Sequence, residues 1–430
     1  MSAGVFKNLL GNLAGPLAGL ASAPILAHAL GVDGRGLVAG ATAPFLLVTT
    51  IATFGIPEAL TYFVARSPSV LRAVRRRGAL LVVLAGAVAT VVSVVLAPLL
   101  ARETPGLAPL MVLALAAVIP TVLVSTLRGS AAGLGQWNLV ALERSVGPVV
   151  RLLAIVVLVA VDHLTVTTAT VAIAYAPVLG GLAYLRPGRA AVPVDPTQPV
   201  PGYRGIVGYG SRVWFGAIAG VLLMRIDQVL MVPLSSTYQL GLYVVAVTVS
   251  ELPLVVNTAV REVVFASDAR SSENSRLTAA ARVSFLVCAA MALVLGATSP
   301  AWLPLAFGRG FGAAVPTTMM LLAAVAVGIP GSVAGAGLSS RGYPQLRSIS
   351  LVIACVVNVV LLIVLVPTLG AFGAALSTLV GNIVSSNFNI VQMRRKFGVP
   401  VLDFYLVRAA DVRLLVGAAL RIVRRRGEPG

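Results

Sequence analysis

Residues 78–101 read GALLVVLAGAVATVVSVVLAPLLA, a run of 24 residues without a single charge. A bilayer core about 30 Å thick is crossed by a helix of about 20 apolar residues, so this run is long enough to span a membrane. It follows the basic stretch RAVRRR at 72–77. The stretch therefore predicts a transmembrane helix that begins among arginines.

The rest of the chain repeats this pattern. Its 430 residues are 58% hydrophobic and 11% charged, whereas a soluble domain is about 45–50% apolar and about 25% charged. A soluble globule is excluded, and we expect an all-α polytopic membrane protein with about twelve transmembrane helices in two six-helix parallel repeats around a central cavity. The predicted spans are 9–31, 37–65, 78–101, 107–127, 138–161, 164–185, 213–234, 239–260, 283–305, 313–338, 346–367 and 371–392.

The basic residues predict the orientation. Of 32 lysines and arginines, the odd-numbered connections hold only Arg35, Arg102 and Arg309, and Arg225 lies inside a span. The other 28 lie in the even connections, near their span ends or in the tails. The positive-inside rule then places both termini in the cytoplasm of a multi-pass protein of the plasma (inner) membrane. The basic residues behind the net charge of +18 thus set the orientation, and we expect them to contact anionic lipids at the cytoplasmic face. We expect no nucleic-acid partner.

The chain divides into two halves. A proline-rich and basic break at 186–212 separates a six-helix lobe at 1–185 from another at 213–392, and residues 393–430 form a basic cytoplasmic tail. The tail is too charged to span, so it is either an interfacial helix or a partly ordered segment. An offset of 205 aligns 7–37 with 212–242 and matches, among others, Gly36-Leu37 with Gly241-Leu242. Two such repeats are typical of transporters that alternate access to a site between the halves.

Several other functions lack the residues that they need. Cys288 and Cys355 lie in apolar runs without metal-site spacing, and His28 and His163 are the only histidines. Neither lysine precedes Ser or Thr, as a Walker A motif requires. We therefore expect no metal, no cofactor and no enzyme activity. The predominance of arginine over lysine suggests GC-rich coding and a bacterial source.

Three groups of short motifs, in order along the chain, resemble the MATE/polysaccharide-exporter (MOP) superfamily and within it the oligosaccharide flippases (Wzx-type). The first is Ala29-Leu30-Gly31 leading into Gly36-Leu37. The second runs from Arg225-Ile226-Asp227-Gln228 to Leu240-Gly241-Leu242-Tyr243 and Glu251-Leu252. The third comprises Gly342-Tyr343-Pro344, Val357-Asn358-Val359, Pro367-Thr368-Leu369-Gly370 and Gly373-Ala374-Ala375.

This resemblance covers essentially the whole chain. It implies a flippase that moves a polyprenyl-diphosphate-linked oligosaccharide from the cytoplasmic to the outer leaflet for cell-surface polysaccharide biosynthesis. A glycan polymerase or glycosyltransferases are the protein partners that it implies. Flippases for the peptidoglycan lipid precursor usually have fourteen spans, so twelve spans favour the exopolysaccharide or O-unit branch.

Ionisable side chains inside a bilayer are functional candidates, because each costs about 2.5–3.5 kcal/mol on insertion scales. Within the predicted spans they are Glu58, Glu143, Arg144, Arg151, Arg225, Asp227 and Glu251. At about 1.5 Å per residue, Arg225 lies about 14 Å and Arg151 about 15 Å from the outer end of its span. Both are therefore expected near the midplane.

Arginine matches the forked geometry of a diphosphate, so we predict that Arg151 and Arg225 bind it in a central cavity. Asp227 and Glu251 are the candidates for charge compensation or ion coupling. Arg225 and Asp227 point to nearly opposite sides of a helix, so Asp227 needs another partner. Arg144 and Glu58, closer to the cytoplasm, are candidates for a gate or a first substrate contact. The alternative is that all these charges form structural ion pairs.

Two other functions stay open at this stage. A MATE-type antiporter that expels cationic drugs in exchange for Na⁺ or H⁺ would depend on Asp227 and Glu251, and two midplane arginines would repel its substrate. A membrane polysaccharide polymerase or ligase would need external catalytic residues. The outer connections offer little beyond Asp33, Arg35, Arg102, Glu103, Asp162, His163 and Arg309.

Overall fold

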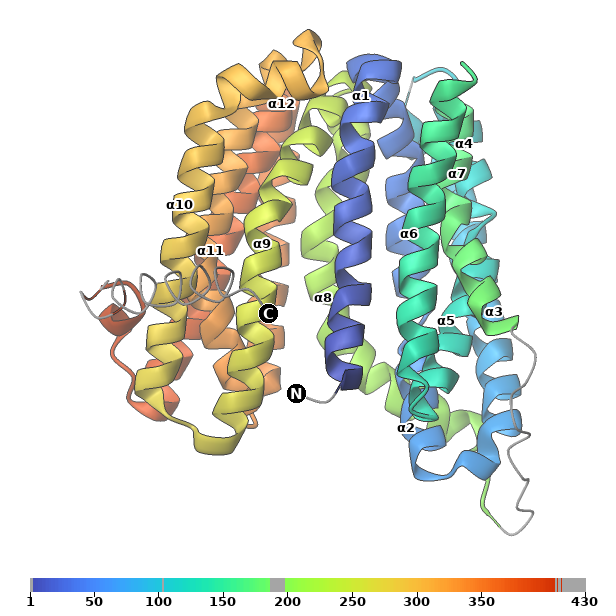
Figure 1. Ribbon diagram of the computed structural model, residues 1–430, viewed down its shortest axis with the longest axis vertical. Helices are drawn as coiled ribbons and strands as arrows, with labels where there is room; N and C mark the ends of the chain where they lie inside the picture. The colour runs from blue at the N-terminus through green and yellow to red at the C-terminus, as the bar shows by residue number, and fades with distance from the viewer. Residues whose placement is uncertain (1–2, 103, 186–197, 407, 409–410, 412–430) are drawn as a thin grey trace, which may run out of the picture.

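The computed structural model describes residues 3–102, 104–185, 198–406, 408 and 411, and all regular elements in these ranges are helices (Figure 1). The α-helices are α1 (Ala3–Ala52), α2 (Ile56–Arg66), α3 (Leu71–Ala101), α4 (Leu107–Leu115), α5 (Val118–Gly133), α6 (Trp137–Ala160), α7 (Val166–Gly180), α8 (Tyr203–Leu234), α9 (Thr237–Ser271), α10 (Asn274–Phe307), α11 (Val315–Ser340) and α12 (Pro344–Phe397). Short 3₁₀ turns are η1 (Pro68–Val70), η2 (Gly181–Leu185), η3 (Arg309–Ala314) and η4 (Val401–Phe404).

The two longest helices each contain a sharp break at a glycine. α1 breaks at Gly31 (φ 66°, ψ −172°) and α12 at Gly370 (φ 53°, ψ −131°). Positive φ is accessible to glycine at little cost, so the chain can turn there and continue as a second helix. Each break falls between two predicted spans, so α1 with α2, and α12, correspond to two predicted spans each.

The outer surface of the helices suits a lipid environment. Val95 of α3 is 72% exposed and Leu305 of α10 is 80% exposed, and large apolar side chains line the exposed faces of both helices. Within the described residues, eight helical segments are long and apolar enough to cross a membrane, or nine if the bent α8 is counted. The protein is therefore a multi-pass membrane protein, as predicted, and the number of twelve crossings stays a prediction.

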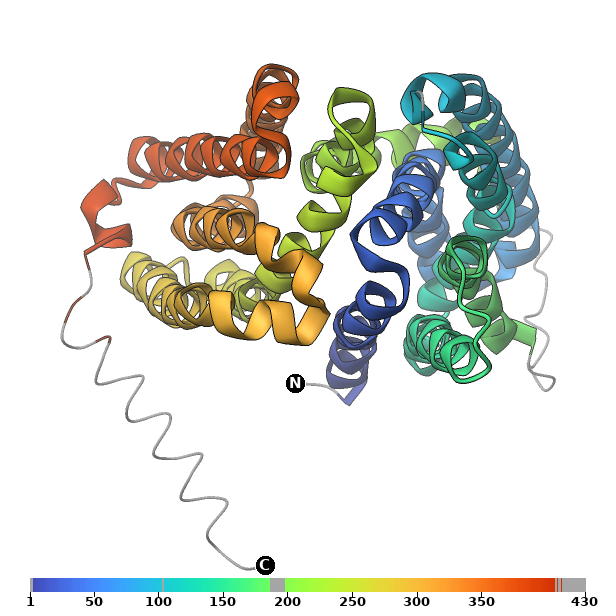
Figure 2. The same cartoon turned by 90° about the horizontal axis from the view of Figure 1, so that it is seen from above.

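The helices form two lobes, an N lobe (residues 3–185) and a C lobe (residues 218–397), which stand side by side in Figures 1 and 2. We call the end of the bundle that carries Gly31 and Gly370 the outer end, following the predicted orientation, and the opposite end the inner end. The predicted linker, 186–212, ends inside α8, and its residues 186–197 lie outside the described residues. The division into lobes at the predicted boundaries stays a prediction.

The buried apolar core is distributed unequally between the two ends. At the outer end one large cluster draws on both lobes, with Val32 and Leu107 from one and Leu240, Phe307 and Phe311 from the other. At the inner end each lobe has a core of its own. These two cores contain Phe45, Ile56, Val74 and Ile206, and Val264, Leu277, Leu338, Ile390 and Phe404, respectively. The lobes are thus joined at the outer end and separate toward the inner end.

Helix α8 connects the two lobes. Its parts Tyr203–Trp214 and Ile218–Leu234 are bent by 61° relative to each other. The first part packs on the N lobe, where the Tyr209 ring stacks on Tyr62 with ring centroids 4.3 Å apart. There the Trp214 indole donates a hydrogen bond of 3.0 Å to the Ile51 carbonyl. The second part packs against α12 in the C lobe.

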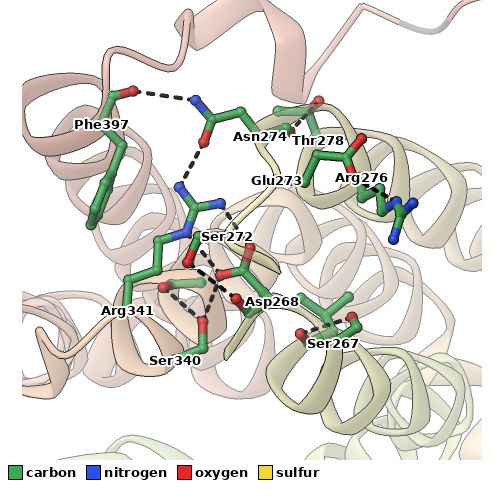
Figure 3. Close-up of polar contacts among 12 residues, drawn as sticks. Ser267, Asp268, Ser272, Glu273, Asn274, Arg276, Thr278, Ser340, Arg341 and Phe397 are labelled. Atoms are coloured by element: carbon green, nitrogen blue, oxygen red, sulfur yellow. Dashed lines mark hydrogen bonds and ion pairs between the residues drawn. The ribbon is translucent and has the colours of Figure 1, made fainter. Parts of the chain in front are cut away.

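A buried arginine holds the inner end of the C lobe together (Figure 3). Arg341, at the end of α11, donates to Asp268 of α9 at 2.7 Å and to the Asn274 side chain of α10 at 2.6 Å. Its guanidinium also lies over the Phe397 ring of α12, 4.8 Å from the centroid. One side chain thus contacts the ends of three other helices, which favours movement of the C lobe as a unit.

The start of the basic tail is held by a second buried arginine. Arg282 of α10 contacts both carboxylate oxygens of Asp411, at 2.6 and 3.1 Å, and the Asp403 carbonyl oxygen at 2.7 Å. The bonds from Arg282 hold the pKa of the Asp411 carboxyl below its usual range. The predicted interfacial helix falls largely on residues 412–430, which lie outside the described residues.

Candidate functional site

A cavity of about 370 Å³ lies between the two lobes, bounded by α1, α6, α7, α8 and α9. Four charged side chains line it: Arg35 of α1, Arg151 of α6, Arg225 of α8 and Glu251 of α9. Gln228 and Thr42 add polar groups. Most of the remaining lining is apolar, as in small-molecule sites generally. The structure therefore brings together both arginines that the sequence predicted for substrate binding and one of the two predicted acids.

Arg151 reaches the cavity across a stripe of small residues on α1. A Cβ atom placed on Gly19 would lie 3.5 Å from Nη2 of Arg151, and one placed on Gly15 would lie 3.9 Å from the Pro148 ring. Small residues at these positions let α6 approach α1 closely. The Nε atom of Arg151 is buried and has no hydrogen-bond partner among the described residues.

Arg225 and Glu251 enter the cavity from two neighbouring helices of the C lobe. The Arg225 guanidinium attracts the Glu251 carboxylate electrostatically, and their similar predicted depths are consistent with this proximity. They do not form an ion pair, because no N···O distance between them is within 4.0 Å. Glu251 therefore only partly compensates the positive charge of the cavity.

Arg35 requires a correction. Its position in the first odd connection led us to treat it as an incidental outer residue. In the structure its side chain is only 9% exposed, lines the cavity and lies close enough to Arg151 for electrostatic repulsion. The break at Gly31 explains the difference, because α1 resumes as a helix at once and carries Arg35 inward. A positive charge within one turn of a helix-breaking glycine was the signal that could have identified it.

The electrostatics of the cavity favour an anion. Within the described residues, Arg35, Arg151 and Arg225 make no side-chain hydrogen bond and no ion pair within 4.0 Å, and Glu251 is the only acid in the lining. Burying unpaired charges costs free energy. An anionic ligand with several acceptor oxygens would accept hydrogen bonds from several of these guanidinium groups at once. The cavity can bind a group with two or more negative charges.

Asp227 lies outside this cavity. It is buried in the C lobe, where it accepts hydrogen bonds from the Tyr243 hydroxyl and, at 2.7 Å, from the backbone N–H of Gln228. Tyr243 also lies 3.4 Å from the Thr378 hydroxyl. The other partner that the sequence required for Asp227 is therefore Tyr243.

Glu58 and Arg144 do not line the cavity that holds Arg151 and Arg225. Glu58 is exposed and lines a cavity of about 100 Å³ beside Trp214, at the inner end. Arg144 belongs to a group in the N lobe with Glu143, Arg128 and Tyr184. In this group Glu143 is buried and pairs with Arg128 at 3.3 Å. A gating or first-contact role for Glu58 and Arg144 stays a prediction.

The described residues offer no obvious metal centre. They contain no cluster of three or more His, Cys, Asp or Glu side chains arranged to hold a metal ion. Both cysteines are free, with Cys288 buried and Cys355 half-buried. The charged groups of the cavity are instead suited to bind an anion.

Comparison with known proteins gives one family match and several similar structures. The family described as "Polysaccharide biosynthesis protein" matches residues 1–265. No curated protein matches the chain. An inward-facing multidrug resistance MATE family transporter of the MOP superfamily is 17% identical, with a TM-score of 0.70 over 91% of this chain and 98% of its own.

Two further similar structures are not described as multidrug transporters. Lipid II flippase MurJ, in an inward closed conformation, is 13% identical, with a TM-score of 0.70 over 98% of this chain and 93% of its own. A MOP superfamily transporter from Pyrococcus furiosus, described as having a binding pocket of reverse polarity that suggests a different function, is 16% identical. Its TM-score is 0.63 over 94% of this chain and 95% of its own. At these identities the likeness shows that the chain has the fold of MOP superfamily transporters.

Proposed function

The chain belongs to the polysaccharide biosynthesis protein family, and we propose that it is a flippase that moves a polyprenyl-diphosphate-linked oligosaccharide from the cytoplasmic to the outer leaflet. The observation that carries this proposal is the group of three arginines, Arg35, Arg151 and Arg225, around one cavity with Glu251 as its only acid. A diphosphate supplies negative charges and acceptor oxygens, which guanidinium groups bind in pairs.

The size of the cavity limits what enters it. Sites of about 300–1,000 Å³ hold a drug-sized group, and this cavity of about 370 Å³ fits a diphosphate with the first sugar. In the proposed mechanism the rest of the glycan extends toward the inner end, where the lobes are separate, and the lipid chain stays in the bilayer.

Alternating access follows from the same arrangement. A shared core at the outer end and separate cores at the inner end support a state that is open at the inner end, which the proposed orientation places in the cytoplasm. Binding of the diphosphate neutralises the repulsion among the arginines and lets the lobes approach at the inner end. We assign no chemical step and no catalytic residue to the cycle, and alternating access needs none.

The acids have separate parts in this proposal. Glu251, in the cavity, compensates the arginines when no substrate is bound. Asp227, enclosed with Tyr243 and Thr378 in the C lobe, is a candidate for ion coupling, because a buried carboxylate responds to a bound cation or proton. The exposed arginines of the inner end contact anionic lipids, and a glycan polymerase or glycosyltransferases are proposed protein partners.

A drug antiporter is the second candidate, and the similarity of fold to multidrug MATE transporters favours it. Its substrates are cations, which three arginines would repel, so we rank it below the flippase. One experiment compares the two. The purified protein is reconstituted in liposomes, and movement of a fluorescent polyprenyl-diphosphate-linked oligosaccharide is measured beside the efflux of a fluorescent cation.

We expect translocation of the lipid-linked sugar by the unmodified protein and strong loss of it in Arg151→Gln and Arg225→Gln. Arg309→Gln, an exposed arginine at the outer end, serves as the matched control. Transport of the cation without any movement of the lipid-linked sugar would overturn the proposal. Full activity of both cavity variants at normal expression would remove the assigned role of the arginines.

A further inference from the structure

Helices α1 and α9 touch backbone to backbone at the outer end, where the two lobes meet. A Cβ atom placed on Gly36 of α1 would lie 1.9 Å from the carbonyl oxygen of Thr237. A Cβ atom placed on Gly241 of α9 would lie 2.1 Å from the carbonyl oxygen of Val32. Both obstacles are main-chain atoms, so no side-chain rotation can make room for a methyl group at either position.

The two contacts are related by the internal repeat. The offset of 205 that aligns the first span of each lobe pairs Gly36 with Gly241 and also pairs Val32 with Thr237. Gly36 therefore contacts Thr237, the counterpart of Val32. In the same way Gly241 contacts Val32, the counterpart of Thr237. Such reciprocity is the property of an isologous interface with two-fold symmetry, here within a single chain.

This contact lies directly beyond the cavity. Arg35, which precedes Gly36, lines the cavity, and so does Val244, one turn after Gly241. Val32 and Leu240 belong to the apolar cluster shared by the lobes, together with Phe307 and Phe311. The glycine contact thus lies between the arginines and the outer end, next to the apolar cluster that both lobes share.

We propose that the reciprocal contact of Gly36 and Gly241 is the outer seal of the transport path, and that it separates and re-forms once in each cycle. This inference rests on the alternating access of the proposed function, but it does not depend on which substrate is moved. It assigns a role to two residues that bear no charge and do not line the cavity of the arginines.

The chemistry of the contact suits a seal that must open repeatedly. The missing Cβ of each glycine would lie against the opposing carbonyl oxygen, so Cα···O is at most about 3.4 Å at Gly36 and about 3.6 Å at Gly241, the range of weak Cα–H···O bonds between helices. Such bonds need close fit but break without leaving a charge in the membrane. A methyl group needs about 3.3 Å from an oxygen. Alanine would therefore push the backbones apart by roughly 1.4 Å at Gly36 and roughly 1.2 Å at Gly241.

The test measures access to the cavity from outside. Thr248, which lines the cavity, is replaced by cysteine in a chain with Cys288→Ala and Cys355→Ala. Intact cells are treated with a membrane-impermeant maleimide. We expect little labelling with both glycines present and more in Gly36→Ala, Gly241→Ala and the double variant. Overpacking of a close-fitted contact shifts such an equilibrium roughly 5- to 150-fold.

Gly40→Ala is the matched control. Gly40 lies one turn further along α1, and a Cβ there would meet only side-chain atoms, at 3.4 Å from Leu107 and from Val232. We expect its labelling to equal that of the parent chain. Equal labelling of the seal variants and this control would overturn the proposal.

Inverted vesicles separate opening from unfolding. A variant that opens outward should label less from the cytoplasmic side than the parent chain, whereas an unfolded variant labels from both sides. Labelling that rises on both sides would also count against the seal. The labelling test adds no substrate, so it is independent of the transport assay. The proposal of a seal can be wrong while the protein still transports lipid-linked sugar, and it can be right while the protein transports none.

Discussion

Replacement of Arg151 by glutamine should separate a binding role of this residue from a structural one. Arg151 has no carboxylate or hydrogen-bond partner among the described residues, and its Nε atom is buried. Breaking a buried ion pair costs about 3–5 kcal/mol, but here no pair exists to be broken. We therefore expect the apparent melting temperature of the ligand-free Arg151→Gln protein to equal or exceed that of the parent protein.

The effect on binding should have the opposite sign. Glutamine keeps an amide donor but loses one charge-assisted hydrogen bond, which corresponds to about 2 kcal/mol or roughly 30-fold in affinity. A ligand at 100 times its dissociation constant stabilises a protein by about 2.7 kcal/mol. After a 30-fold loss of affinity, the same concentration stabilises it by only about 0.9 kcal/mol.

The assay is thermal unfolding of purified protein at one scan rate, with and without a short polyprenyl diphosphate that carries one sugar. The ligand-induced shift should fall to about one third in Arg151→Gln and stay unchanged in the control Arg309→Gln. A lower melting temperature without ligand, together with an unchanged ligand shift, would refute the reasoning and show that Arg151 is structural.

Three further predictions concern other charged groups. Glu251→Gln removes the only acid of the cavity lining, so a titration should show several-fold tighter binding of the diphosphate, and net transport should slow. Weaker binding would contradict the role of Glu251 in charge compensation. Arg341→Ala leaves Asp268 buried without its ion-pair partner, so the free energy of unfolding should fall by about 3–5 kcal/mol. The exposed variant Arg276→Ala should change it little, and chemical denaturation measures both. The pKa of Asp411 is depressed by Arg282, so docking of residues 401–406 and of Asp411 should be complete above the usual aspartate pKa of about 3.9 and be lost as pH falls through the lower value of the folded protein. Hydrogen exchange of this segment against pH should show that loss, and Asp411→Asn should weaken docking at neutral pH and abolish the acid transition.

The sequence alone predicted which arginines lie deep in their spans, although it misplaced Arg35. Apolar run length and the rise of an α-helix placed Arg151 and Arg225 near mid-membrane, and the structure brings both to one cavity with Glu251. Helix geometry likewise placed Asp227 and Arg225 on opposite sides. The breaks between predicted spans fell at Gly31 and Gly370, because glycine alone tolerates the backbone conformation found there.

The sequence by itself thus determined the membrane class, the all-helical fold and the supply of arginines, since these follow from composition and from the length of the apolar runs. Only the tertiary structure decided which way each side chain faces. A helix that is apolar on all sides carries no pattern that fixes its rotation, so the inward turn of Arg35, the pairing of Asp227 with Tyr243 and the exposure of Glu58 were not predictable. The contact between Gly36 and Gly241 depends on two backbones that meet across the lobes, and that approach is set by packing of the whole bundle.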